Sequence, residues 1–212
     1  MLAGHHRRPG APGILLGTTD KVTALDPAGS WDLGSATLQN QVFSWLLTSA
    51  PGSTDPVPDL AASAEFTDPT HYRVALREDA AFANGNPLTA SDVVFTFERQ
   101  VAIAAPNGPS SLLSDMVSVE AEDDSTVVFT LATPDNALWP QILTSPAAAI
   151  VDEDVFSADS LTTDDDIVAG DAFNGQYSIT SYTLNSLVQL TRNDSYDGLL
   201  GAAANESVIV RY

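Results

Sequence analysis

The stretch from Leu76 to Arg99, LREDAAFANGNPLTASDVVFTFER, carries the clearest structural signals in this chain of 212 residues. Its start continues an alternation of apolar and polar residues from Tyr72, which is typical of a half-buried strand. Residues 84–87, Asn-Gly-Asn-Pro, then supply turn chemistry, because Gly tolerates positive φ and Pro cannot donate a ladder hydrogen bond. The first half of the stretch therefore predicts a strand that runs into a turn.

The second half of the stretch predicts a capped amphipathic helix. Thr89 can cap its first turn, since a hydroxyl oxygen can accept a hydrogen bond from an otherwise unpaired amide. Asp92 stands three residues later, at the partner position of a capping box, where Glu or Gln is commoner. Apolar residues then recur at helical spacing: Val93, Val94, Phe97 and Val101. By these signals alone the unit is a structural element.

The composition narrows the classes of protein that this chain can be. A net charge of −20, with Lys21 as the single lysine, argues against nucleic acid or an anionic membrane surface as a partner. It is compatible with a secreted protein or with a salty environment, and it does not choose between them. The absence of cysteine excludes disulfides, thiolate metal sites and cysteine nucleophiles. No apolar run reaches the roughly 18 residues of a membrane span.

The stretch from Leu76 to Arg99, which we call the organising stretch, resembles the signature of the family 5 extracellular solute-binding proteins. These are the oligopeptide-, dipeptide- and nickel-binding components of bacterial ABC importers. That signature runs from a Leu-Arg pair through a Gly turn and Pro-Leu-Thr-Ala to an aromatic residue and Arg. The matching residues follow in the same order without gaps: Leu76-Arg77, Asp79, Phe82, Gly85, Pro87-Leu88-Thr89-Ala90, Asp92-Val93, Phe95, Phe97 and Arg99. Shorter elements of the family match at Leu25-Asp26-Pro27 and at residues 58–63. Gln176, Asp194 and Asp197 depart from the family pattern in the last third.

Patterns elsewhere in the chain predict the remaining elements. Ser35 is the expected cap of a helix whose buried face runs to Leu47, and Trp139 is expected in the core. The other expected elements are a strand at 14–17, a hairpin from 117–121 and 127–131, a helical piece at 138–143, a second hairpin from 173–182 and 187–193, and a strand at 206–212.

The resemblance implies an α/β fold of the periplasmic-binding-protein type, in which two lobes close on a ligand. We expect this chain to form the first lobe, with a mixed sheet and an inserted smaller α+β subdomain. The expected division is a flexible leader at 1–13, a main lobe from 14–48 and 167–212, and the insertion at 49–166, with the second lobe absent from this chain. The leader is basic but lacks the apolar core of a complete signal peptide.

The candidate ligand contacts lie in the loop before the first expected helix. A Trp in this Gly-flanked loop is either a core residue or an exposed contact, and its sequence position does not decide between them. In the family the loop lines the ligand cleft, so the resemblance makes Trp31, Asp32, Leu33 and Gly34 the expected contacts. An aromatic face, a carboxylate and backbone groups together can satisfy the amides and the amino end of a peptide.

No arrangement of residues predicts catalysis, a cofactor or a metal site. His5 and His6 lie in the leader, His71 stands alone, and the common nucleophile, phosphate-loop and zinc motifs are missing. Carboxylates are plentiful by composition, so their presence carries no information about catalysis, and an acid–base hydrolase stays an alternative. The acidic clusters at 152–154 and 164–166 lack the spacing of a calcium loop and are expected to be solvated surface.

The resemblance implies a substrate-binding component that is not an enzyme. It would capture a peptide, or a related solute, and deliver it to the ABC permease in the membrane. The expected location is extracellular or periplasmic, with lipoprotein-type anchoring at the cell surface in the full-length form. Peptide, dipeptide, nickel chelate or another solute stay open as ligands. The alternative is a secreted module of one lobe that binds a protein partner.

Overall fold

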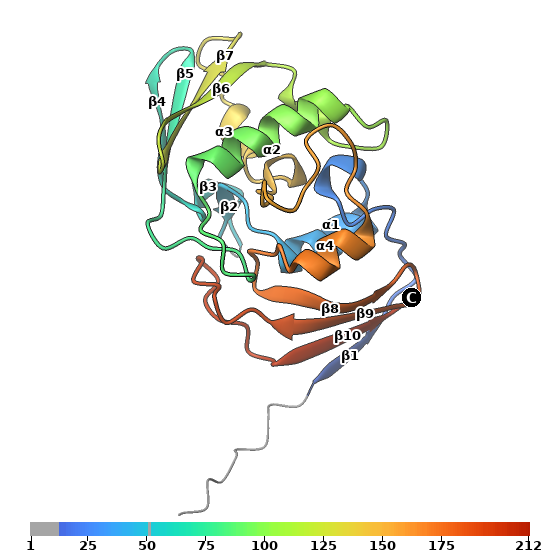
Figure 1. Cartoon of the computed structure of the whole chain (residues 1–212). Helices are drawn as coiled ribbons and strands as arrows, with labels where there is room; N and C mark the ends of the chain where they lie inside the picture. The colour runs from blue at the N-terminus through green and yellow to red at the C-terminus, as the bar shows by residue number, and fades with distance from the viewer. Residues whose placement is uncertain (1–12, 51) are drawn as a thin grey trace, which may run out of the picture.

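The computed structural model describes residues 13–50 and 52–212, and Figure 1 shows the arrangement of their elements. The helical segments are η1 (Pro27–Gly29), α1 (Leu33–Val42), α2 (Ala90–Ile103), η2 (Ser110–Leu113), α3 (Trp139–Ile142), η3 (Pro146–Ala148) and α4 (Asp164–Gly170). The strands are β1 (Ile14–Gly17), β2 (Leu47–Ser49), β3 (Pro56–Pro58), β4 (Ala61–Asp68), β5 (His71–Leu76), β6 (Met116–Asp123), β7 (Thr126–Leu131), β8 (Tyr177–Thr183), β9 (Leu187–Arg192) and β10 (Ser207–Arg211). None of the described helices has the length and apolar character to cross a bilayer.

Two four-stranded sheets dominate the structure. In the α2-side sheet the strand order is β4-β5-β7-β6, and every neighbouring pair is antiparallel. In the α1-side sheet the order is β1-β10-β9-β8, and the β1–β10 pair is parallel, so this sheet is mixed. Helix α2 lies along the first sheet, whereas α1 and α4 lie over the second (Figure 1). The expected hairpins and terminal strand are therefore confirmed.

The organising stretch folds as its residues predict. The strand that ends at its first residue, Leu76, is β5, which lies at the centre of the α2-side sheet. Its helix is α2. The Thr89 hydroxyl accepts a hydrogen bond from an amide of the first turn, while the Asp92 carboxylate accepts one from the Thr89 amide at 2.8 Å. The capping box is thus complete. Val101 is 50% exposed, so the apolar stripe of the helix ends one turn earlier than expected.

The apolar side chains gather in two clusters. One fills the space between α2 and its sheet, where the Phe97 and Phe129 rings pack edge to face at 4.8 Å and Trp139 is fully buried. The other lies between α1, α4 and the α1-side sheet, and Phe43 and Phe173 belong to it. Burial of such large side chains is the main favourable contribution to the stability of each cluster.

A buried ion pair joins α2 to the loop that follows β1. The Arg99 guanidinium donates two hydrogen bonds to the Asp26 carboxylate, at 2.9 and 2.8 Å, and both side chains are 1% exposed. The same carboxylate accepts from the amides of Ala28 and Thr162. Arg99 also donates to the Ser157 carbonyl at 2.8 Å. This network fixes η1, and with it the segment that follows, against the end of α2.

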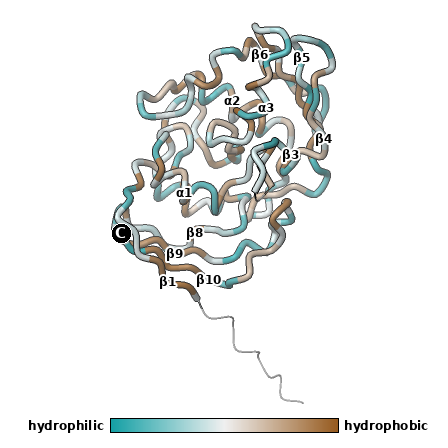
Figure 2. Tube along the Cα trace, turned by 180° about the vertical axis from the view of Figure 1, so that it is seen from behind, coloured by the Kyte–Doolittle hydropathy of each residue, from teal (hydrophilic) through white to brown (hydrophobic). Residues whose placement is uncertain are grey.

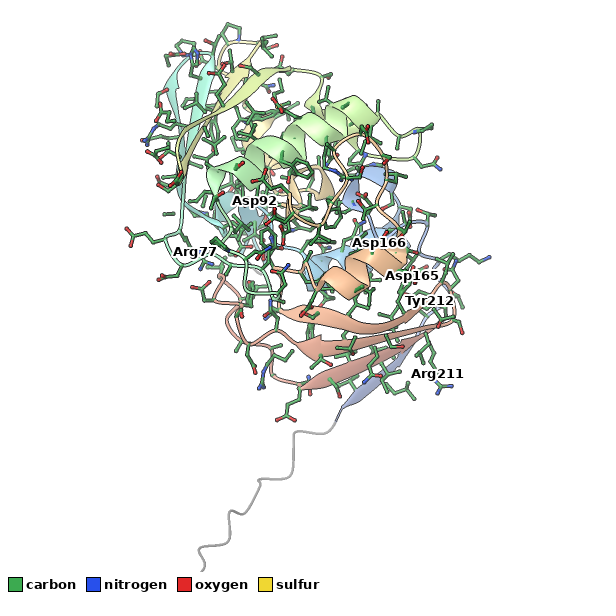
Figure 3. The ribbon with its side chains drawn as sticks, in the orientation of Figure 1. Arg77, Asp92, Asp165, Asp166, Arg211 and Tyr212 are labelled. Atoms are coloured by element: carbon green, nitrogen blue, oxygen red, sulfur yellow. The ribbon has the colours of Figure 1, made fainter. Side chains whose placement is uncertain are left out.

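Three expectations about the chain are wrong. Asp32, rather than Ser35, caps α1, and the helix ends at Val42 instead of continuing to Leu47. The sequence offers two good caps three residues apart, and the tertiary contacts described below select the first. Asp152 is 1% exposed rather than solvated, because its carboxylate accepts hydrogen bonds from the side chains of Asn84 and Asn86. In the other acidic cluster, Asp165 and Asp166 lie on the exposed start of α4, as expected (Figure 3).

Candidate functional site

Asp32 is held in place as the cap of α1. Its carboxylate accepts hydrogen bonds from the Ser35 amide at 2.8 Å, the Ser35 hydroxyl at 2.8 Å and the Thr23 hydroxyl at 2.5 Å. Burial raises the pKa of Asp32, but the bonds from Ser35 and Thr23 outweigh it and hold the pKa below its ordinary value. The carboxylate is therefore ionised at neutral pH and fixed in direction.

Gly34 allows α1 to start directly against the preceding loop. A Cβ at this position would overlap the carbonyl oxygen of Lys21, so only glycine fits here. The close approach brings Ser35 to the position where its amide and hydroxyl meet Asp32. Gly34 is therefore required for packing, whether or not a ligand touches its backbone.

Trp31 lines an open cavity rather than the core. Its side chain is 52% exposed, which excludes the interpretation of Trp31 as a core residue. The cavity has a volume of about 500 Å³ and is lined by Thr23, Trp31, Asp32, Pro106, Asn107, Gly108 and Ser111. We call it the Trp31 cavity. Its size falls within the roughly 300–1,000 Å³ range of small-ligand sites.

The far wall of the Trp31 cavity comes from the loop after α2 and from the start of η2. A Cβ at Gly108 would overlap the carbonyl oxygen of Ala28, so this loop packs backbone to backbone against η1. Pro106, Asn107 and Ser111 are exposed at the cavity. Sequence reasoning missed these residues. The Pro/Gly/Ser composition marks a loop, but nothing local shows that a segment some 75 residues away lies beside Trp31.

A second cavity lies between α1 and the part of the α1-side sheet that contains β1 and β10. Its volume is about 450 Å³, and the exposed wall is mostly apolar. The lining residues include Leu16, Leu38, Tyr177, Val208, Val210 and Tyr212. Tyr212 lies just past β10, beside the edge of this sheet (Figure 3). Figure 2 shows the apolar character of β1, which forms that edge.

Three of the four expected ligand contacts line one or the other of these two cavities. Trp31 and Asp32 line the Trp31 cavity, whereas Gly34 lines the second one. Leu33 is 74% exposed and is not among the lining residues of either. The four residues are thus consecutive at the start of α1, with Gly34 buried, and they do not all face one cavity.

The electrostatic environment of the Trp31 cavity is acidic. None of the described residues that line it is basic, and Asp32 contributes a carboxylate. Four arginines elsewhere in the described ranges are paired with carboxylates: Arg73 with Glu122, Arg77 with Asp197, Arg99 with Asp26, and Arg192 with Asp194. Within those ranges, no group of three or more His, Cys, Asp or Glu side chains is arranged to hold a metal ion. His5 and His6 lie outside the described residues.

A protein-family profile matches most of this chain. The sequence profile described as bacterial extracellular solute-binding proteins, family 5 Middle, matches residues 55–212. The probable D,D-dipeptide-binding periplasmic protein DdpA of Escherichia coli is 28% identical over 191 residues, which cover 87% of this chain and 36% of the relative. The periplasmic oligopeptide-binding protein OppA of Escherichia coli is 25% identical, covering 83% of this chain and 35% of the relative. This chain therefore spans about a third of the length of these two relatives.

Solved structures show the same fold. Listeria monocytogenes OppA bound to peptide superposes with a TM-score of 0.82 at 22% identity, covering 96% of this chain and 43% of that one. Burkholderia pseudomallei OppA gives a TM-score of 0.81 at 20% identity, with 97% and 42% covered. These likenesses confirm the expected α/β fold of the periplasmic-binding-protein type.

Proposed function

The chain belongs to the bacterial extracellular solute-binding proteins of family 5, and on that premise we propose that it captures peptides for an ABC-type importer. The observation that carries the proposal is the Trp31 cavity, which combines an exposed indole, an oriented carboxylate and the polar side chains of Thr23, Asn107 and Ser111. Such a combination of apolar and convergent polar groups is typical of small-ligand sites. Trp31, Asp32, Leu33 and Gly34 are the proposed ligand contacts.

The proposal extends to the partners and the location of the protein. Two curated relatives are named as peptide-binding periplasmic proteins. By analogy, we place this chain outside the cytoplasm, anchored at the cell surface, with a membrane permease as the receiver of the solute. The family consists of solute-binding proteins, so we assign the chain no catalytic activity.

We also propose a division of the chain into two parts, which the two apolar clusters support. Residues 14–48 and 167–212 would form the main lobe, and residues 49–166 the inserted subdomain. The cluster under α2 draws its buried residues from Leu46 to Ile150. The cluster under α1 draws most of its buried residues from both flanking segments, although Ala149, Val151 and Phe156 also belong to it.

Native mass spectrometry of the purified protein tests the proposed function. We expect a series of masses above that of the free chain, each reporting a retained or added tripeptide. Trp31→Ala should lose the series, whereas Leu138→Ala, at another exposed apolar residue (69%), should retain it. A clean mass for the free chain, unchanged after addition of a tripeptide mixture, would contradict peptide capture.

A second candidate function is a module that binds a protein partner, and β1 favours it. All four residues of β1 are exposed, and Leu15 and Leu16 are 65% and 50% exposed. An apolar edge strand offers unpaired backbone groups to another chain. Light scattering after gel filtration should then show an assembly that Leu15→Glu disrupts. A monomer at all concentrations, together with saturable peptide binding, would remove this candidate.

A further inference from the structure

The Trp31 cavity has the chemistry of a site for a positively charged side chain. The indole of Trp31 and the Asp32 carboxylate line the same space, and Pro106, Asn107 and Ser111 form the opposite wall. We propose that this cavity binds a guanidinium group, so that the preferred solutes are peptides that carry arginine. The inference rests on the proposed function and adds the class of solute to it.

The charge of the cavity favours a cation over an anion or a neutral group. Asp32 is fixed by hydrogen bonds from Ser35 and Thr23, so it presents its charge without reorganising when a ligand arrives. No basic residue among those that line the cavity competes for it. The net charge of −20 adds a field of the same sign over the whole chain, which attracts cations toward the surface.

The exposed indole favours guanidinium over ammonium. A cation within about 6 Å of the centre of a Trp ring is attracted to its face, and Trp is the best aromatic partner. A guanidinium is planar and weakly hydrated, so it can stack on the ring while its N–H groups donate hydrogen bonds in the guanidinium's own plane. Asn107 and Ser111 offer acceptor oxygens across the cavity for those N–H groups. The indole face, the Asp32 carboxylate and the oxygens of Asn107 and Ser111 therefore all suit a guanidinium group.

Matched tripeptides test this specificity. Ala-Arg-Ala, Ala-Lys-Ala, Ala-Leu-Ala and Ala-Glu-Ala differ only in the central side chain, and calorimetry gives the Kd of each. We expect the arginine peptide to bind about tenfold more tightly than the leucine peptide, with lysine between them and glutamate weakest. If leucine binds as well as arginine, the inference is wrong while the proposed function stands. If none of the peptides binds, both fail.

Three variants locate the preference. Trp31→Leu should reduce the arginine-to-leucine preference to about threefold or less, because the π face is lost. Asp32→Asn should reduce it similarly, because asparagine keeps an oxygen that can cap the helix, whereas the charge and the oxygen that accepts from the Thr23 and Ser35 hydroxyls are lost. Asp123→Asn is the matched control, an exposed carboxylate that accepts from the Ser125 amide and hydroxyl at a turn. Equal loss in Asp123→Asn and Asp32→Asn would assign the preference to net charge and overturn the site.

Discussion

Replacing Arg99 by methionine should severely destabilise this protein. The substitution removes the partner of a carboxylate that is 1% exposed and leaves Asp26 with the amides of Ala28 and Thr162 as its donors. Loss of one partner of a buried ion pair costs about 3–5 kcal/mol, because the remaining charge is no longer compensated. The carbonyl of Ser157 also loses its hydrogen bond from Arg99. We therefore expect a decrease of about 3–5 kcal/mol in the free energy of unfolding.

Urea unfolding of four proteins measures this decrease and identifies its cause. Asp26→Asn in the Arg99→Met background should cost no more than Arg99→Met alone, since the uncompensated charge is then gone. Arg73→Met is the matched control: its ion pair with Glu122 joins side chains that are 39% and 50% exposed. An exposed pair contributes about 0–1 kcal/mol. The reasoning is refuted if Arg99→Met costs no more than Arg73→Met.

Three further predictions concern packing, salt and pH. Gly34→Ala should lower the free energy of unfolding in urea by about 1–3 kcal/mol, because the added Cβ overlaps the Lys21 carbonyl. Gly17→Ala, with open space around its position, should lower it by less than about 1 kcal/mol. Equal decreases would contradict the packing argument. Raising the salt concentration from 0.1 to 1 M shortens the Debye length from about 10 to about 3 Å and so screens the repulsion between like charges. Because this chain has a net charge of −20, its Tm in calorimetry should rise. An unchanged Tm would count against charge repulsion as a destabilising force. The hydrogen bond from His71 lowers the pKa of Asp68 to about 2. The stabilisation from Asp68 is therefore present above its unfolded pKa of about 3.9, and it is lost as the pH falls from there through about 2. An NMR titration midpoint near 4 for Asp68 would show that this bond does not form in solution.

The sequence could predict features whose partners lie close along the chain. The capping box joins Thr89 to Asp92, three residues apart, and both the residue types and the spacing are visible in the sequence. Hairpins are equally local, because the alternation of apolar residues fixes which face of each strand is buried. The resemblance to the family made it possible to predict the fold class as well.

Features that depend on distant partners could not be predicted. Asp152 is buried because Asn84 and Asn86, more than 60 residues earlier, donate to it. Asp32 rather than Ser35 caps α1 because Gly34 packs against the Lys21 backbone. The candidate site shows the same limit. The sequence made Trp31 and Asp32 candidate contacts, but it did not predict the opposite wall of the cavity that they line, because that wall depends on a tertiary contact.

The indole N–H signals of the three tryptophans in an NMR spectrum test solute binding at the Trp31 cavity most directly. Trp31 is 52% exposed, whereas Trp45 and Trp139 are 7% and 0% exposed, so the signals report on one open and two buried positions. On titration with a mixture of tripeptides we expect the Trp31 signal to shift and saturate while the Trp139 signal stays fixed. If the Trp31 signal does not move, or if all three move together, solute does not bind at this cavity.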